Sequence, residues 1–378
     1  MTKKLHILFL CSWYPSKVLP TNGDFIQRHA EAVRLNHKVS ILHLISDKRI
    51  PKSKIEISTV NDVQTFIGYI KHTKNPFLKL FRFFKTYNQL LNKVDRFDLV
   101  HLNVLFPFGL LALYQKIIKK TPFIISEHWT GYLTSQNCEI SFFHKTLSKL
   151  ITKNAAYICP VSNELEISMQ NLGLKGNYKP IGNVVDTTTF SEYSEKESEF
   201  TLIHISSLND TQKNISGMLR TAKKLEEKIG RFTWKFIGGT SEKYDCLIDK
   251  LAFTKASIQF TNHLPQKELS IHIQKAHICI SFSNYETFGI TLAEAIACGT
   301  FVISTNTGIL NELTNKKYFS IIPIHDEAAL LNEIIHLKTA PPILDSNKMN
   351  TFIKEKFGPQ IIAKEFSSLY FKSLNNNS

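Results

Sequence analysis

The stretch HICISFSNYETFGITLAEAIACGTFVIS, residues 277–304, decides the fold class of this chain. It begins with an apolar run at 277–282, passes through a polar loop into a helical pattern at 290–297, and ends with a second apolar run at 300–304. A short buried strand, a helix and another short buried strand form a βαβ unit, whose strands are parallel. We therefore predict an α/β fold with a parallel sheet covered by helices.

The same alternation continues through both halves of the chain. Candidate strands in the second half are 200–205, 233–237 and 258–260, with candidate helices at 214–229, 243–253 and 266–275. Candidate strands in the first half are 5–11, 38–45, 99–104, 123–126 and 157–161. The charged stretch 191–199 between them is typical of a linker. We expect two doubly wound, Rossmann-like domains, residues 1–190 and 191–355, that face each other across a cleft and bind a two-part ligand.

Length and composition exclude several classes of protein. A chain of 378 residues with 43% hydrophobic and 21% charged residues is typical of two ordinary globular domains. The longest apolar stretch, 102–114, is shorter than the roughly 20 residues of a membrane-spanning helix. Six scattered cysteines without metal-site spacing, and the lack of a signal-peptide pattern, predict a reduced, cytoplasmic protein.

Positive charge is concentrated in the first half of the chain. Residues 1–190 contain 25 Lys and Arg against 12 Asp and Glu, whereas residues 191–378 contain 21 against 20. Such an asymmetry indicates that the first domain faces an anionic partner. No nucleic-acid motif is visible, so a membrane surface or a phosphorylated substrate is favoured over RNA or DNA.

The loop and helix inside the 277–304 stretch carry the candidate chemistry. Glu286 follows a strand, Gly289 allows close backbone approach at the start of a helix, and Glu294 lies about one turn into that helix. Amides at a helix N-terminus favour a phosphate. Two carboxylates beside them can accept hydrogen bonds from sugar hydroxyls at two places along one ligand. This arrangement predicts a nucleotide-sugar site.

These residues resemble a known family. Glu286 and Glu294, with the AIACGTFVI run that follows, look like the retaining glycosyltransferases of family 4, which have the GT-B fold. The resemblance extends over nearly the whole chain, through LPQKEL at 264–269, KAHICI at 275–280, TNTG at 305–308, FDLVH at 97–101, SEHW at 126–129, PVS at 160–162 and NVVD at 183–186.

The resemblance implies roles for residues of the second domain. Glu294 would hold the ribose hydroxyls and Glu286 the donor sugar, while Lys213 would neutralise the diphosphate leaving group. Backbone amides that touch the phosphates or the sugar would come from Phe288, Gly289 and Ile290. Glu286 is not assigned as a nucleophile, because the family implies a front-face displacement assisted by the departing phosphate.

In the first domain, the resemblance places His128 at the reaction centre. Gly23, in the loop after the first strand, would let the backbone approach the donor or acceptor. The resemblance also implies that the C-terminal helix, residues 356–378, crosses back to this domain.

Three positions depart from the family pattern. Ser207 stands where the family usually has an arginine, six residues before Lys213. Asn183-Val184-Val185-Asp186 replaces Asn-Gly-Val-Asp, and Gly308-Ile309 replaces Gly-Gly. We expect weaker diphosphate binding, or another cation that replaces the missing arginine.

Residues 71–96 combine aromatic and basic side chains at helical spacing. Phe77, Leu80, Phe81, Phe84 and Leu91 share one face, while Lys79, Arg82, Lys85 and Lys93 intersperse with Phe83 and Tyr87. Two interpretations remain open. The segment is either an ordinary helix packed on its sheet or an amphipathic helix lying on an anionic membrane.

Together, these observations predict a retaining glycosyltransferase that uses a UDP-, GDP- or ADP-sugar. The expected acceptor is a lipid-linked glycan at the inner face of the cytoplasmic membrane, as in cell-surface polysaccharide assembly, with peripheral contact to the anionic membrane. No cofactor or metal is expected, because the chain has no Asp-x-Asp motif and Lys213 can assist the leaving group. The alternatives are a small soluble acceptor, a nucleotide-sugar 2-epimerase of the same fold, or a non-catalytic nucleotide-sugar binder.

Overall fold

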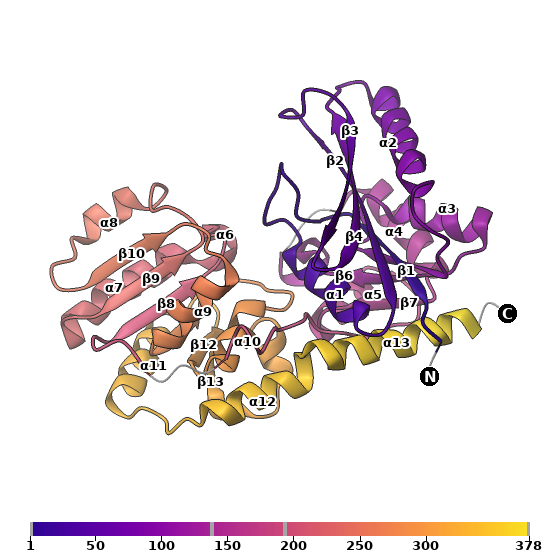
Figure 1. The fold of residues 1–378 in the computed structure, drawn as a ribbon. Helices are drawn as coiled ribbons and strands as arrows, with labels where there is room; N and C mark the ends of the chain where they lie inside the picture. Colours follow the sequence, from indigo (N-terminus) through magenta and orange to yellow (C-terminus); the bar gives the residue numbers. More distant parts are fainter. Residues whose placement is uncertain (1–2, 137–139, 192–194, 376–378) are drawn as a thin grey trace. The chain divides into compact units, whose positions relative to one another are not determined.

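The computed structural model describes residues 3–136, 140–191 and 195–375. The chain forms two compact units, of which unit 1 contains residues 1–184 and 359–378 and unit 2 contains residues 185–358 (Figure 1). Part of the linker expected at 191–199 lies outside the described residues.

Unit 1 is built on a seven-stranded sheet with the order β3-β4-β2-β1-β5-β6-β7. Its strands are β1 His6–Cys11, β2 Lys38–Asp47, β3 Lys54–Val60, β4 Val63–Lys71, β5 Leu99–Asn103, β6 Phe123–Glu127 and β7 Tyr157–Pro160. Its helices are α1 Asp24–Arg34, α2 Pro76–Leu91, α3 Gly109–Lys119, η1 Thr130–Tyr132, η2 Thr134–Gln136, α4 Phe142–Asn154, α5 Asn163–Asn171 and α13 Pro359–Asn375.

The central strands of this sheet are buried on both faces. Every residue of β1, β5 and β6 is buried, and β1 pairs in parallel with β2 and β5. Near-continuous apolar strands are what a parallel sheet covered by helices requires. The five strands expected in this half of the chain are therefore confirmed, with their ends shifted by at most two residues.

The hairpin of β3 and β4 was not predicted. These strands pair antiparallel from Lys54↔Tyr69 to Val60↔Val63, and the turn residues Asn61 and Asp62 have φ of 47° and 60°. Two consecutive residues with positive φ are typical of a type I′ hairpin turn. The hairpin places β4 beside β2 and extends the sheet by two strands.

Helix α13, yellow in Figure 1, packs against α1 on unit 1. The hydroxyl of Tyr370 lies 2.8 Å from Nδ1 of the buried His101, and the Phe366 ring lies 4.8 Å from the His101 ring. The last helix of the chain thus completes the core of the first unit.

Unit 2 is built on a six-stranded parallel sheet with the order β10-β9-β8-β11-β12-β13. Its strands are β8 Thr201–Ile205, β9 Thr233–Ile237, β10 Ser257–Thr261, β11 Ile278–Ser281, β12 Phe301–Thr305 and β13 Phe319–Ile322. Its helices are α6 Asp210–Lys213, α7 Ile215–Ile229, α8 Asp245–Leu251, α9 Gln266–Lys275, α10 Ile290–Ala297, η3 Ile309–Glu312, η4 Lys316–Tyr318, α11 Glu327–Thr339 and α12 Ser346–Phe357. The βαβ unit predicted at 277–304 is β11, α10 and β12, with β11 and β12 parallel.

The boundaries of the units differ by a few residues from the expected 190/191 and 355/356. The Val185 amide donates to the Phe357 carbonyl at 2.9 Å, and the Asn350 side-chain amide donates to the carbonyls of Thr187 and Phe190 at 3.2 and 3.0 Å. These bonds attach residues 185–190 to α12 and place them in unit 2.

Five cysteines lie within the described residues, and all five are unpaired thiols; Cys138 lies outside them. Four of the five are buried and Cys246 is exposed. No helix in the described part of the chain is both long and apolar enough to cross a lipid bilayer.

Candidate active site

The carboxyl edge of the sheet of unit 2 brings Glu286 and Lys213 together. Lys213 ends α6, just after β8, and Glu286 lies in the loop between β11 and α10. The Lys213 ammonium forms an ion pair with Oε1 of Glu286, and their side chains are only 15% and 10% exposed. A buried ion pair at this edge has little water to compete with it, so both groups are held where ligands of parallel sheets bind.

Further polar groups fix the geometry of this pair. The Ser283 hydroxyl donates to Oε1 of Glu286 at 2.9 Å and lies 2.9 Å from the Ser281 hydroxyl. The Asn284 amide donates to the Gln212 carbonyl at 2.7 Å, which joins the β11–α10 loop to α6. Sequence reasoning missed these residues, because serines and asparagines in a loop carry no specific signal.

Helix α10 begins at this site without a side-chain cap. Gly289, its N-cap, has φ of 79°. Only glycine adopts this conformation without strain. The partial positive charge of the helix N-terminus therefore adds to that of Lys213 in attracting an anion.

The other predicted donor residues lie on the same helix or beside it. Ile290 is the first residue of α10, and Phe288 is buried with its ring 5.1 Å from that of Phe357. Glu294 is 1% exposed, one turn along the helix. Burial, and then the carboxylate of Glu294, raise the pKa of the Cys279 thiol to about 12.

Gly308-Ile309, which departs from the family's Gly-Gly, lies against the same loop. A side chain at Gly308 would meet the Phe288 carbonyl oxygen at 2.7 Å, and the Ile309 amide donates to that oxygen at 2.9 Å. The first glycine of the pair is therefore needed for close packing. At the second position only the backbone amide makes this contact, so Ile309 can replace the family's glycine there.

Ser207 is exposed in the loop after β8. Its neighbour Ser206 packs tightly against Gly238, where an added side chain would meet the Ser206 carbonyl oxygen at 1.9 Å. Gly238 has φ of 122°. This close approach of the β8 and β9 loops was not predicted, because an isolated Gly-Gly after a strand is compatible with many turns.

In unit 1, His128 follows β6 directly and is 5% exposed. Its ring lies 4.4 Å from that of Phe25 and 5.5 Å from that of His29. Among the described residues, neither ring nitrogen of His128 has a hydrogen-bond partner. Burial, and then the neighbouring histidines His29 and His101, hold its pKa well below the usual range. The imidazole is therefore neutral, with one nitrogen that can donate and one that can accept a hydrogen bond.

Glu127, the residue before His128, holds the backbone around it. Glu127 is fully buried, and its Oε1 accepts hydrogen bonds from the amides of His128 at 2.8 Å and Trp129 at 2.9 Å. Its Oε2 accepts from the Leu105 amide at 2.9 Å. Burial raises the pKa of Glu127, and the three amides act against that rise. The carboxylate thus ties the loop after β5 to the loop that carries His128.

Replacement of Glu127 by alanine is expected to destabilise unit 1 by about 3 kcal/mol, because three amides lose their acceptor in a buried place. For a unit of this size, the thermal unfolding midpoint would fall by roughly 6 to 12 °C. Scanning calorimetry measures this shift. The control is Glu166→Ala, which removes a surface bond to Gln170. Equal midpoints for the two variants would contradict the role of Glu127.

Gly23 has a packing role in the structure. It is the N-cap of α1 with φ of 78°, and an added side chain would meet the Trp13 carbonyl carbon at 2.9 Å. Glycine is therefore required here by backbone packing. The approach of a ligand to this loop stays a prediction.

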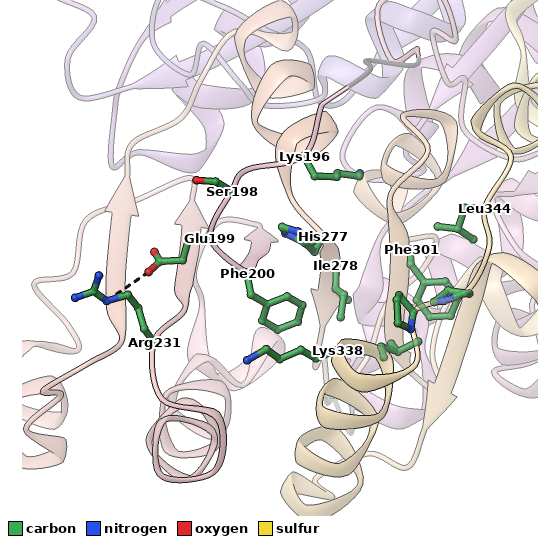
Figure 2. A pocket seen from close by; sticks show the side chains of 13 residues that line it. Lys196, Ser198, Glu199, Phe200, Arg231, His277, Ile278, Phe301, Lys338 and Leu344 are labelled. Carbon is green, nitrogen blue, oxygen red and sulfur yellow. Dashed lines mark ion pairs between the residues drawn. The ribbon is translucent and has the colours of Figure 1, made fainter.

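A cavity of about 780 Å³ in unit 2 lies away from these residues. Figure 2 shows it lined by Phe200, His277 and Phe301, which stand at the amino ends of β8, β11 and β12. The Lys196 ammonium donates to the Ala276 carbonyl at 2.9 Å and to the Thr300 hydroxyl at 3.0 Å. Because the cavity is at the opposite edge of the sheet from Glu286, it is distinct from the candidate donor site.

Metal-ligating side chains do not gather at this site or elsewhere in the described ranges. Within residues 3–136, 140–191 and 195–375, no group of three or more His, Cys, Asp or Glu could hold a metal ion. Two positive groups lie beside Glu286 at this edge, the Lys213 ammonium and the N-terminus of α10.

Comparison with known proteins relates both units to one class of enzyme. Residues 185–356 match the model of the family described as glycosyl transferases group 1, and residues 28–189 match that described as glycosyltransferase family 4. The chain is 21% identical over 329 residues to an α-monoglucosyldiacylglycerol synthase from Acholeplasma laidlawii, covering 79% of this chain and 81% of the relative.

Solved structures resemble the whole chain. Sucrose-phosphate synthase from Thermosynechococcus elongatus has a TM-score of 0.80 at 16% identity, covering 99% of this chain and all of the other. HepE from Anabaena, in complex with UDP and glucose, has a TM-score of 0.73 at 13% identity, covering 97% of this chain and all of the other. These likenesses confirm the predicted fold of two Rossmann-like domains. The chain belongs to glycosyltransferase family 4, and it is a glycosyltransferase with the GT-B fold.

Proposed function

We propose that this enzyme transfers a sugar, with retention of its anomeric configuration, from a nucleoside diphosphate sugar to a lipid-linked acceptor at a membrane surface. The proposal that the donor is a nucleoside diphosphate sugar rests on the buried ion pair of Lys213 and Glu286. This pair lies beside the N-terminus of α10, which no side chain caps. A lysine and a helix N-terminus suit a diphosphate, and a carboxylate suits sugar hydroxyls.

On this proposal, Lys213 and α10 stabilise the charge that develops on the departing nucleoside diphosphate. Electrostatic groups that are already in place need no reorganisation during the reaction. The enzyme would therefore need no metal ion. Glu294 would hold the ribose, and His128 would bind a hydroxyl of the donor sugar or acceptor. UDP is a reasonable first donor to test, because it is bound in the similar HepE structure.

The proposal that the acceptor is linked to a lipid rests on the amphipathic helix α2 of unit 1. The apolar stripe of α2, which we define as Phe77, Leu80, Phe81 and Phe84, is exposed, with fractions of 82%, 59%, 61% and 38%. The buried residues of α2, Thr86, Tyr87 and Leu90, lie in its C-terminal half and pack against the unit. The helix therefore packs on its sheet as well as presenting an apolar surface. Tyr87, which the sequence placed among the basic residues, is fully buried.

Exposed basic residues accompany the apolar stripe. Lys74, Lys79 and Lys85 are exposed, and no acidic residue occurs within α2. Four exposed apolar side chains on one face, with lysines near them, are typical of helices that lie in the interface of an anionic membrane. The relative from Acholeplasma is named as the synthase of a glucosyl lipid, which supports a lipid acceptor for this chain.

Substitution of two residues of the stripe tests the membrane contact. Phe77→Ser/Phe81→Ser is expected to weaken binding to phosphatidylglycerol-containing vesicles roughly tenfold or more, because two aromatic side chains no longer enter the interface. Vesicle sedimentation measures this loss. The control is Ile271→Ser/Ile343→Ser, which removes exposed apolar residues from unit 2. Unchanged binding of the Phe77/Phe81 variant would contradict peripheral docking through α2.

The proposed reaction is tested by incubating the enzyme with UDP-, GDP- and ADP-glucose and detergent-solubilised bacterial lipid extract. We expect one nucleoside diphosphate to be released only when lipid is present, and NMR to show the product linkage with the anomeric configuration of the donor. Release with soluble sugars alone would favour a small soluble acceptor. Conversion of UDP-N-acetylglucosamine without any acceptor would favour a 2-epimerase, and an inverted linkage would contradict retention.

A further inference from the structure

A basic pocket lies in unit 1, away from His128. We define the basic pocket as the cavity of about 630 Å³ lined by Lys17, Val18, Arg49, Ile50, Pro51, Lys52, Ser53, Lys54 and Tyr69. Four of these nine residues carry positive charge and none carries negative charge. The volume is within the range of ligand sites, which is about 300 to 1,000 Å³.

Two cations of the basic pocket are already paired with carboxylates. The Lys17 ammonium lies 2.7 Å from Glu56, and the Arg49 guanidinium donates to both oxygens of Asp47 at 2.7 and 3.0 Å. Within the described part of the chain, neither Lys52 nor Lys54 forms an ion pair with a carboxylate. The Lys54 ammonium lies 5.3 Å from the centre of the Tyr69 ring. The pocket thus keeps two uncompensated positive charges.

The walls of the pocket are held by buried groups. Ile50 is 5% exposed and Tyr69 is 2% exposed, so both belong to the core of unit 1. The Tyr69 hydroxyl accepts a hydrogen bond from the Lys17 amide at 3.3 Å, and the Ser53 hydroxyl accepts from the Lys71 amide at 2.9 Å. These bonds hold the loops after β1 and β2 against β4, so the backbone that carries the lysines is fixed.

The basic pocket is at the carboxyl edge of the sheet, and β4, which borders it, is bonded to α2. Lys17 follows β1, residues 49–53 follow β2, and Tyr69 is close to the end of β4. Arg82 of α2 donates to the carbonyl of Lys71, the last residue of β4, at 3.0 Å. The pocket therefore lies where the ligands of such a sheet bind and beside the helix that carries the apolar stripe.

From this placement we propose that the basic pocket binds the phosphate or diphosphate group that joins a glycan to its lipid in the acceptor. This inference rests on the proposed function and specifies its acceptor. With the apolar stripe in the membrane interface, a phosphate at the membrane surface is presented beside Lys52 and Lys54. Uncompensated lysines at a rigid edge stabilise such a group by charge and by hydrogen bonds.

The sheet order sets how far the basic pocket lies from His128. The strands that border the pocket, β1 to β4, are two to five strand spacings from β6, the strand before His128. At about 4.8 Å per spacing, a phosphate in the pocket leaves room for one or more sugars before a hydroxyl at His128.

Charge reversal of the two uncompensated lysines tests the inference. We expect calorimetry to show that farnesyl diphosphate binds the wild type and binds Lys52→Glu/Lys54→Glu at least tenfold more weakly. Lys3→Glu/Lys4→Glu, with the same change of net charge at the amino edge of the sheet, should bind as the wild type does. Inorganic pyrophosphate should bind more weakly than farnesyl diphosphate, because it lacks the lipid chain.

Three results would overturn the proposal: no binding of farnesyl diphosphate to the wild type, equal weakening in both charge-reversal variants, or equal affinity for pyrophosphate and farnesyl diphosphate. UDP binding is titrated in the same samples as a separate readout of unit 2. Loss of farnesyl diphosphate binding in the Lys52/Lys54 variant supports the pocket even if no nucleotide binds. Failure of the pocket and failure of the proposed donor site are therefore distinguishable.

Discussion

Replacement of Lys213 by methionine is expected to lower kcat for sugar transfer by about 100- to 1000-fold, with a much smaller change in KM. The lysine charge is needed most when the diphosphate departs, so its loss raises the barrier more than it weakens ground-state binding. Methionine is similar in length and retains the apolar packing of the lysine stem. Steady-state kinetics with the preferred nucleotide sugar provides the measurement.

Lys235 is a matched control for Lys213. Lys235 lies on β9, and its side chain is 16% exposed, against 15% for Lys213. Its ammonium forms an ion pair with Glu197 at 3.1 Å. Lys235→Met removes an ion pair whose lysine is as buried as Lys213, without touching the carboxyl edge of the sheet. We expect it to keep most of its activity. Equal kcat values for the two methionine variants would show that Lys213 has no part in the reaction.

Glu294→Ala is expected to weaken binding of the nucleoside diphosphate by about 10- to 100-fold. A hydrogen bond to a charged acceptor is worth about 1.5 to 3 kcal/mol, and a carboxylate that holds ribose hydroxyls provides at least one such bond. Glu294 is almost completely buried one turn into α10, so water cannot replace its oxygens easily. Calorimetric titration measures this change directly.

Two further variants make the Glu294 result specific. Glu294→Gln retains one acceptor oxygen and should bind with intermediate affinity. Glu268→Ala removes an exposed carboxylate from α9 and should bind as the wild type does. If Glu294→Ala bound the nucleotide as tightly as the wild type, the ribose role of Glu294 would be wrong.

Much of the fold could be predicted from the sequence, because its central strands are buried on both faces. The runs at 5–11 and 277–282 consist of nearly continuous apolar residues, and they correspond to β1 and β11. Strand β3 gave a weaker signal, since it is at the edge of the sheet and Ile55 and Ile57 are 36% and 50% exposed. Strand β13 was missed in the same way, at the other sheet's edge.

The candidate site was predictable in part. The resemblance pointed to Glu286, Glu294 and Lys213, but no pattern along the chain shows that Lys213 pairs with Glu286 across 73 residues. Likewise, the three amides held by Glu127 come from two loops, which only the folded sheet brings together. The roles of these residues in binding and transfer stay predictions.

The basic pocket shows why a count of charged residues is not enough to locate an anion-binding site. The sequence gives an excess of 13 positive charges in residues 1–190 without indicating where they act. In the structure, Arg49 and Lys17 are compensated by nearby carboxylates, whereas Lys52 and Lys54 are not. In unit 1, the position of the uncompensated charges indicates better than the total where an anionic group is expected to bind.

The most direct test of the account is calorimetric titration of the wild type with UDP, GDP and ADP, each alone and as its glucose conjugate. We expect one of the three nucleotides to bind with a dissociation constant in the micromolar range, and its sugar conjugate to compete for the same site. If none of the six compounds bound, the pair of Lys213 and Glu286 beside α10 would not be a donor site, and the proposed transfer reaction would be contradicted.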